Sequence, residues 1–338
     1  MKALTVFDVG QAGFQEVAEP GAPGEGEAVL KVKALGFCGS DLATFLGRNP
    51  LVSYPRVVGH ELAGEVIEAD DPAGRIAPGD AVMVDPIFPC GNCIACRRGR
   101  YNCCVKSETL GVQRDGGAMP FLRLPVSKLH KPPRPISWEE LALVEPMAIG
   151  FHAVRRGAVD ETDTVCLLGC GAIGLGALQA AKAHGARVLA ADIKDASLEL
   201  AERLGADATV NSAKADLAGA LRRFTDGEGA TVVLEAVGLP SLIEQTVELV
   251  ANSGRIVLVG YAKGAVTFDP KVFLTKELDL RGSRNSCRVF PELLDHVAEN
   301  RIRVRELITH RFPFEEGDRA LQYWSTHTDD VIKIVLEF

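Results

Sequence analysis

Residues 164–192 read TVCLLGCGAIGLGALQAAKAHGARVLAAD, in which three kinds of segment follow one another. An apolar run at 164–168 predicts a buried strand, and a glycine-rich turn follows it. Residues 175–184 have the 3.6-residue period of a helix, which Gly185 ends, and residues 187–192 form a second apolar run. This order of strand, turn, helix and strand predicts a parallel sheet that is covered by helices.

The glycine-rich turn, Gly169-Cys170-Gly171-Ala172-Ile173-Gly174, fits the pattern G-x-G-x-x-G. In this pattern the first glycine permits a tight turn, the second lets the backbone approach a pyrophosphate, and the third lets the helix pack on the strand. Asp192 ends the next strand, where its carboxylate would accept hydrogen bonds from an adenosine ribose and repel a 2′-phosphate. The alternative is a doubly wound domain that binds no nucleotide. The pattern favours NAD over NADP, and the predicted cofactor-binding residues are Gly169, Gly171, Ala172, Ile173, Gly174 and Asp192.

The alternation of strands and helices continues at 231–235, 243–250 and 255–260, whereas the first third of the chain consists of short alternating segments between glycine and proline turns. The chain is also longer than the ~250–300 residues at which single cores stop growing. We therefore predict an α/β protein of two domains. A mostly β domain takes residues 1–147 and 285–338, and a Rossmann doubly wound parallel-sheet domain takes residues 148–284.

The chain carries a net charge of −8 and has no apolar run near the ~20 residues that a membrane helix needs. Long-range repulsion works against binding to nucleic acid or to an anionic membrane. The sequence from Met1 runs directly into a strand-like pattern, without the features of a signal peptide. We expect a cytoplasmic protein whose partners are small molecules.

Five of the nine cysteines lie within residues 90–104, and in a reducing compartment such crowding indicates metal rather than disulfides. They are Cys90, Cys93, Cys96, Cys103 and Cys104. Four thiolates close a tetrahedron around zinc and leave no position for substrate, so a site of this kind is structural. The alternative is a nucleic-acid-binding zinc ribbon, to which the nearby basic residues would lend charge. Ribbons usually have two cysteine pairs about 15–20 residues apart, which this spacing does not match.

A second candidate metal site is divided between two short segments. Cys38 lies in the segment GFCGSD at 36–41, and His60 and Glu61 follow Gly59. One thiolate, one imidazole and one carboxylate would leave the fourth position of a zinc ion open, as catalytic sites do. Nothing in the spacing joins the two segments. Taken alone, Cys38 is more often a buried apolar residue and His60 a polar residue with satisfied hydrogen bonds. Adjacent residues of a strand also point to opposite faces, so His60 and Glu61 would share a metal only if the chain bends at Gly59.

Taken together, these residues resemble the zinc-dependent medium-chain dehydrogenase/reductase family. The two segments above, the cysteine cluster, Glu145-Pro146 and the dinucleotide motif occur in that family's order along essentially the whole chain. The resemblance implies a GroES-like catalytic domain beside the Rossmann domain, and a homo-oligomer that is a dimer or a tetramer. It implies a catalytic zinc on Cys38, His60 and Glu61, with Glu145 bound directly or through water. It also implies a structural zinc on Cys90, Cys93, Cys96 and Cys104, with no ligand role for Cys103.

The Glu-Pro form at 145–146 resembles the polyol and sugar dehydrogenase branch, and segments 53–61, 111–117 and 282–285 resemble bacterial L-galactonate 5-dehydrogenases. The resemblance implies NAD-linked oxidation of a secondary alcohol of a sugar acid or polyol, with an L-galactonate-like substrate favoured. Alternatives in the same class are another polyol, a sugar phosphate and L-threonine. Outside it, the alternatives are a zinc-free quinone reductase and a non-enzymatic role. The chain departs from many relatives at Ala43, where they have a histidine.

The expected catalytic residues are Ser40, Glu61 and Glu145, and the expected substrate contacts are Thr44, Arg284 and Asn285. Ser40 is the candidate to take the proton of the alcohol, and its alternative role is that of a turn hydroxyl. Arg284 follows the last strand of the nucleotide domain. Its guanidinium would bind a carboxylate through two parallel hydrogen bonds, and the alternative is a surface arginine that covers apolar area.

Overall fold

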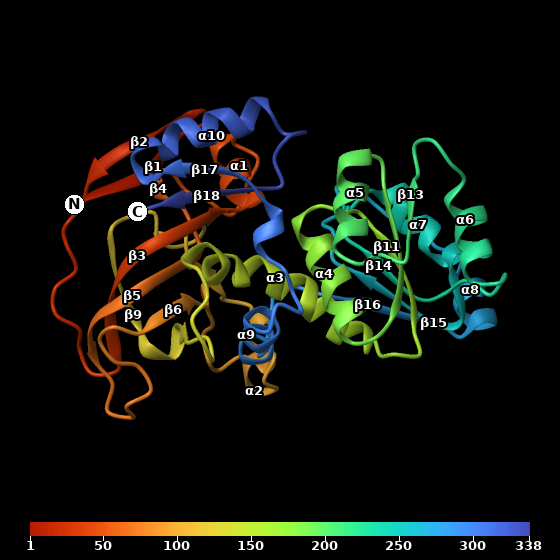
Figure 1. The fold of residues 1–338 in the computed structure, drawn as a ribbon, viewed down its shortest axis with the longest axis horizontal. Helices are drawn as coiled ribbons and strands as arrows, with labels where there is room; N and C mark the ends of the chain where they lie inside the picture. Colours follow the sequence, from red (N-terminus) through yellow and green to blue (C-terminus); the bar gives the residue numbers. More distant parts are fainter. The chain divides into compact units, whose positions relative to one another are not determined.

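The computed structural model describes residues 1–338 and divides the chain into two compact units. Unit 1 contains Met1–Pro146, Phe290–Glu299 and Val304–Phe338, and unit 2 contains Met147–Val289 and Asn300–Arg303. The first and last strands both lie in unit 1 (Figure 1). The chain leaves unit 2 at Val289, a few residues after the predicted change at 284/285, because the segment that follows the last strand of the parallel sheet stays packed in that unit. Arg284 and Asn285 therefore belong to unit 2.

Unit 1 is mostly β, as predicted, and most of its strand pairs are antiparallel. Its largest sheet has seven strands, whose path is β10 (Leu129–His130), β6 (Ala81–Val84), β5 (Glu61–Asp70), β3 (Glu27–Phe37), β18 (Lys333–Glu337) and β17 (Ile308–Pro313), with β9 (Phe121–Pro125) also paired to β3. Two smaller sheets consist of β2 (Gln11–Glu16), β1 (Lys2–Asp8) and β4 (Arg56–Val57), and of β7 (Ile87–Phe88) and β8 (Glu108–Thr109). The helices are α1 (Gly39–Phe45), α2 (Ile94–Arg97), α9 (Phe290–Ala298), α10 (Gly317–Thr326) and the first part of α3 (Trp138–Gly157).

The antiparallel pair of β3 and β5 lies at the centre of this sheet. Most apolar side chains of both strands are buried, among them Leu30, Leu35 and Leu62, whereas Ile67 of β5 is exposed. The register pairs Gly36 with Glu61, so the end of β3 lies directly beside the start of β5. The two short segments that the sequence leaves unconnected, around Cys38 and around His60, therefore meet at one end of this strand pair.

Unit 2 contains a six-stranded sheet whose strand pairs are all parallel. Its order is β13 (Ala208–Asn211), β12 (Arg187–Asp192), β11 (Thr164–Leu168), β14 (Ala230–Glu235), β15 (Val250–Leu258) and β16 (Asp279–Gly282). The helices are α4 (Ala172–Ala183), α5 (Asp195–Arg203), α6 (Leu217–Phe224), α7 (Pro240–Leu249), α8 (Pro270–Lys276) and the end of α3. The chain runs outward from β11 to β13 and then returns to the other side of β11, which is the doubly wound order with its switch point between β11 and β14. None of the helices in the structure combines the length and the apolar character that crossing a membrane requires.

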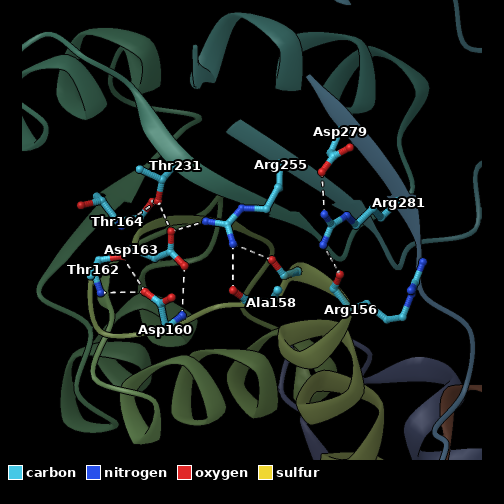
Figure 2. Close-up of polar contacts among 11 residues, drawn as sticks. Arg156, Ala158, Asp160, Thr162, Asp163, Thr164, Thr231, Arg255, Asp279 and Arg281 are labelled. Atoms are coloured by element: carbon cyan, nitrogen blue, oxygen red, sulfur yellow. Dashed lines mark hydrogen bonds and ion pairs between the residues drawn. The ribbon is translucent and has the colours of Figure 1, made fainter. Parts of the chain in front are cut away.

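Arginine side chains of β15 and β16 bind backbone carbonyls at the end of α3 (Figure 2). Arg255 donates hydrogen bonds to the carbonyls of Gly157 and Ala158, at 2.9 and 2.8 Å, and pairs with the buried Asp163. Arg281 donates to the carbonyl of Arg156 at 3.0 Å. The last carbonyls of a helix have no partners within the helix and carry partial negative charge, so these guanidinium groups stabilise the end of α3 in two ways.

Candidate metal and dinucleotide sites

Cys38, His60 and Glu61 converge at the end of the β3–β5 pair. Their ligand atoms all lie within 4.8 Å of one another. Cys38 is the residue before α1, and Glu61 is the first residue of β5. Gly59 adopts φ +94°, and a Cβ at this position would lie 2.5 Å from the Leu35 side chain. Only glycine therefore permits the bend that brings His60 and Glu61 to the same site.

Asp41, which the sequence does not single out, organises the backbone of both segments. Its carboxylate accepts hydrogen bonds from the backbone N–H of Cys38 at 2.8 Å and of Gly59 at 3.1 Å. One of its oxygens also lies 3.9 Å from Nδ1 of His60. Burial raises the pKa of Asp41 above its usual range. The sequence signal is its place in the segment around Cys38, three residues after the thiol.

A buried lysine from the last strand also reaches this site. Lys333 forms an ion pair with Glu61 and donates a hydrogen bond to the carbonyl of Phe37 at 3.2 Å. Burial alone would lower the pKa of Lys333, but the charges of Glu61 and Cys38 more than offset it and raise the pKa. The sequence signal is a lone charge in the apolar segment 331–335, and its partners cannot be inferred from that segment alone.

The charges around this site favour a bound cation. Burial, together with the charge of Glu61, raises the pKa of Glu145 to about 7, although the charge of His60 acts to lower it. The pKa of His60 lies well above its usual value even though burial lowers it, because Cys38 and Asp41 are close. Nδ1 of His60 and Oε2 of Glu61 are buried and have no hydrogen-bond partner. A thiol, an imidazole and a carboxylate with unused donor atoms fit the ligand preferences of zinc.

The cysteine cluster forms a second group of possible metal ligands in unit 1. The four thiols of Cys90, Cys93, Cys96 and Cys104 lie within 4.8 Å of one another, and Cys103 lies outside this group. The backbone N–H groups of Cys90 and Lys106 donate to Sγ of Cys104 at 3.2 and 3.3 Å. Four sulfur donors around one point fit a closed tetrahedral zinc site.

The glycine-rich loop between β11 and α4 has the geometry that each glycine predicts. Gly169 adopts φ +96°, and a Cβ on Gly174 would lie 1.9 Å from the Gly169 carbonyl oxygen. A Cβ on Gly171 would meet nothing within 4 Å, so the space beside this residue is open. Asp192 accepts hydrogen bonds from the backbone N–H groups of Cys170, at 2.7 Å, and Lys194, at 3.0 Å. The carboxylate therefore holds the loop and the end of β12 together.

Exposed apolar side chains follow three of the strands at the carboxyl edge of the parallel sheet. Ile193 follows β12, Val237 and Leu239 follow β14, and Tyr261 follows β15. Val237 packs against Gly169, because a Cβ on that glycine would lie 2.6 Å from it. Ligands of open parallel sheets bind at this edge, beside the switch point. The sequence does not single out these residues, since each lies just beyond a strand in a segment without a motif.

The remaining predicted side chains differ in their surroundings. Oγ of Ser40 is shielded from solvent and has no hydrogen-bond partner. Thr44 is buried, and its hydroxyl donates to the Ser40 carbonyl at 2.8 Å and accepts from Asn49 at 3.3 Å, so it is engaged inside unit 1. Arg284 is exposed and Asn285 adopts φ +47°, in the segment after β16. The proton-transfer and substrate roles of these residues stay predictions.

Two family models match the chain. One, described as alcohol dehydrogenase GroES-like domain, matches residues 24–134, and the other, described as zinc-binding dehydrogenase, matches residues 172–299. L-galactonate-5-dehydrogenase of Escherichia coli (strain K12) is 37% identical over 318 residues, which cover 94% of this chain and 93% of that protein.

Solved structures agree with these matches over the whole chain. Galactitol-1-phosphate dehydrogenase from Escherichia coli has a TM-score of 0.91 at 29% identity, and the match covers 100% of both chains. An alcohol dehydrogenase from Escherichia coli CFT073, complexed with NADH, has a TM-score of 0.92 at 31% identity over 100% of this chain and 99% of that one. The chain therefore belongs to the zinc-type medium-chain alcohol and polyol dehydrogenase family, whose GroES-like and Rossmann-like parts correspond to its two units.

Proposed function

We propose that the chain is a zinc-dependent, NAD-linked dehydrogenase that oxidises a secondary alcohol of a sugar acid or polyol, with an L-galactonate-like substrate favoured. The observation that carries this proposal is the convergence of Cys38, His60 and Glu61 within 4.8 Å, where Nδ1 of His60 and Oε2 of Glu61 are buried without a hydrogen-bond partner. A zinc-free quinone reductase or a non-enzymatic protein would give these three residues no common purpose.

In this proposal, Cys38, His60 and Glu61 hold the catalytic zinc, and Glu145 binds it directly or through water. Zinc, when bound, supplies Lewis acidity that lowers the pKa of an alcohol hydroxyl towards neutrality. Ser40 would relay the proton of that hydroxyl, accepting it at Oγ as the serine's own hydroxyl proton passes to a further acceptor, a role supported by the absence of any other partner for this atom. Asp41 keeps the backbone of Cys38 and Gly59 in place through its two hydrogen bonds.

Unit 2 would bind NAD, which accepts the hydride when it is present. The open space beside Gly171 and the free N–H groups at the start of α4 suit a pyrophosphate. The carboxylate of Asp192 would accept hydrogen bonds from an adenosine ribose and repel a 2′-phosphate. NAD is therefore preferred over NADP, and the protein would need less NAD than NADP to reach half of its maximal rate.

The substrate class is proposed from two sources. Relatives named for L-galactonate and for galactitol 1-phosphate are similar over nearly the whole chain. Arg284, exposed in the segment after β16, offers the planar cation that a sugar-acid carboxylate binds well. Another polyol, a sugar phosphate and L-threonine remain the alternative substrates, and the Arg284 experiment below distinguishes the acid from the neutral polyols.

We also propose that the chain forms a homo-oligomer through β16. This strand is one edge of the six-stranded sheet, and Leu280 is exposed on it. An unpaired edge is a template for a further strand. An antiparallel pair of two copies centred on Leu280 would set Asp279 of each copy opposite the partner's Arg281, which is a favourable pair of charges.

Cys38→Ser is expected to abolish turnover of NAD with a sugar-acid and polyol panel and to remove one of two zinc ions per chain. NADH binding, measured by fluorescence titration, is expected to stay unchanged because Cys38 belongs to unit 1 and the glycine loop to unit 2. Cys103→Ser is the matched control and should keep both metal and activity. A Cys38→Ser variant with a tenth of the wild-type rate would contradict the proposed catalytic site.

Cys96→Ser is expected to lower the midpoint of thermal unfolding by roughly 5–10 °C, because a structural zinc contributes folding free energy directly. Activity per folded molecule should change much less. Scanning calorimetry with metal analysis tests this, again beside Cys103→Ser. If the protein instead folds with an unchanged midpoint but has no activity, the four-thiol group is not a structural site.

Arg284→Lys is expected to raise KM for an aldonate while KM for a neutral polyol changes little. The loss corresponds to about 1.5–3 kcal/mol, the range of a charged hydrogen bond, because lysine cannot form the two parallel bonds of a guanidinium. Steady-state kinetics on matched acid and polyol substrates provide the measurement. Equal losses on both would assign Arg284 to the cofactor or to hydroxyl groups and would remove the main support for a sugar acid.

Leu280→Asp is expected to convert the oligomer into smaller species, because the central pair would place two carboxylates directly opposite each other. Leu51→Asp, at another exposed leucine in unit 1, is the control and should keep the wild-type mass. Sedimentation velocity gives the masses. A wild-type chain that sediments as a monomer contradicts the proposed assembly.

A further inference from the structure

Lys333 is a charged residue in a strand that otherwise buries apolar side chains. Its side chain is 4% exposed, and the next three residues of β18, Ile334, Val335 and Leu336, are fully buried. Moving an ammonium group out of water is costly unless it is paired and hydrogen-bonded. The position of Lys333 therefore requires an interaction that an apolar residue could not provide.

Its Nζ atom connects the two segments that carry the proposed catalytic ligands. It donates to the carbonyl of Phe37, the residue directly before Cys38, and it forms an ion pair with Oε1 of Glu61. The strand order explains this reach. Strand β3 lies between β18 and β5, and its end pairs with Ile334 on one side and with Glu61 on the other. One ammonium group from the last strand thus spans all three strands at the metal end of the sheet.

The same contact decides which oxygen of Glu61 is available. Oε1 is engaged by Lys333, whereas Oε2 is buried and has no partner. The carboxylate lies over Gly36, because a Cβ on that glycine would be 2.4 Å from Oε2 and 2.6 Å from the Leu143 side chain. The small residue beneath it and the lysine beside it together leave Glu61 little freedom to turn.

We propose that Lys333 is a positioning residue of the metal site, which fixes the Phe37–Cys38 backbone and leaves a single oxygen of Glu61 for the metal. This inference rests on the proposed zinc site of Cys38, His60 and Glu61. Residues that orient metal ligands commonly change metal affinity by about 10- to 100-fold when they are removed. Positioning by Lys333 strengthens metal binding, whereas repulsion between its ammonium group and the metal weakens it. The rate of metal release after Lys333 is replaced therefore shows which effect is larger.

The test measures zinc release from the full-length, zinc-loaded protein into excess chelator that contains a chromogenic zinc indicator. The variants are Lys333→Met, which keeps the length of the side chain without its charge, and Lys333→Arg, which can donate to both partners. Lys33→Met is the matched control, since Lys33 pairs with Glu65 at 3.2 Å on the same sheet but away from the ligands. The four-cysteine site of the same chain is an internal control. Because Cys38→Ser removes the catalytic zinc, the release phase that remains in this variant belongs to the four-cysteine site.

Lys333→Met is expected to release the catalytic zinc about tenfold faster or more, and Lys333→Arg to stay close to the wild type. The cysteine-site phase and the Lys33→Met control should not change. Unchanged or slower release from a folded Lys333→Met protein would overturn the positioning role, and slower release would assign repulsion as the dominant effect. If Lys333→Met does not fold, as judged by circular dichroism, Lys333→Gln replaces it with the same criteria. A wild-type chain that binds only one zinc contradicts the proposed function and is distinguishable from a failure of Lys333.

Discussion

The antiparallel pairing of β3 with β5 is the interaction on which the metal site depends. It sets Gly36 opposite Glu61, so that the residues just beyond one strand and at the start of the other share a small volume. The hydrogen bonds of this ladder and the apolar residues along it make the pairing rigid, and a slip by one residue would turn every side chain to the other face of the sheet. Register therefore controls the chemistry at this end as well as the core.

Charge balance is the second constraint on this site. Three carboxyl groups, those of Asp41, Glu61 and Glu145, are almost completely buried, together with the imidazole of His60. Asp41 is satisfied by two backbone N–H groups, and Glu61 by Lys333 on one oxygen only. The remaining negative potential raises the pKa of His60 well above its usual value. A bound divalent cation would neutralise this excess, which gives the buried carboxylates a purpose that packing alone does not.

Local sequence was sufficient for the parts of the fold that depend on neighbouring residues. The strands at 164–168 and 187–192 and the roles of Gly169 and Gly174 follow from periodicity and backbone sterics. The helix predicted at 243–250 begins earlier, at Pro240. Proline fits the first turn of a helix, where its missing N–H needs no partner, so it starts this helix and does not break it. The likeness to a known family supplied the link between Cys38 and His60, which spacing alone did not.

Contacts between distant segments could not be predicted in this way. Lys333 is 272 residues from Glu61, and its partner becomes evident only from the order of strands in the sheet. The hydrogen bonds of Thr44 and the exposed apolar residues after β12, β14 and β15 likewise depend on the folded backbone. The predicted domain boundary at residue 285 differs from the observed boundary at Phe290. The prediction ended the domain at its last strand, β16, whereas the residues between that strand and Phe290 still pack in unit 2.

The continuity of α3 has a consequence for recombination between members of the family. The division between the units falls between Pro146 and Met147, inside this 20-residue helix and one residue beyond Glu145. Its final carbonyls are bound by arginines that belong to the parallel sheet. A chimaera that joins one parent's amino-terminal half to another's nucleotide-binding half at this point would combine two half-helices with different packing faces. If the crossover point lies before Trp138, the helix and its arginine partners come from the same parent. Glu145 then comes from the parent that supplies the nucleotide-binding half.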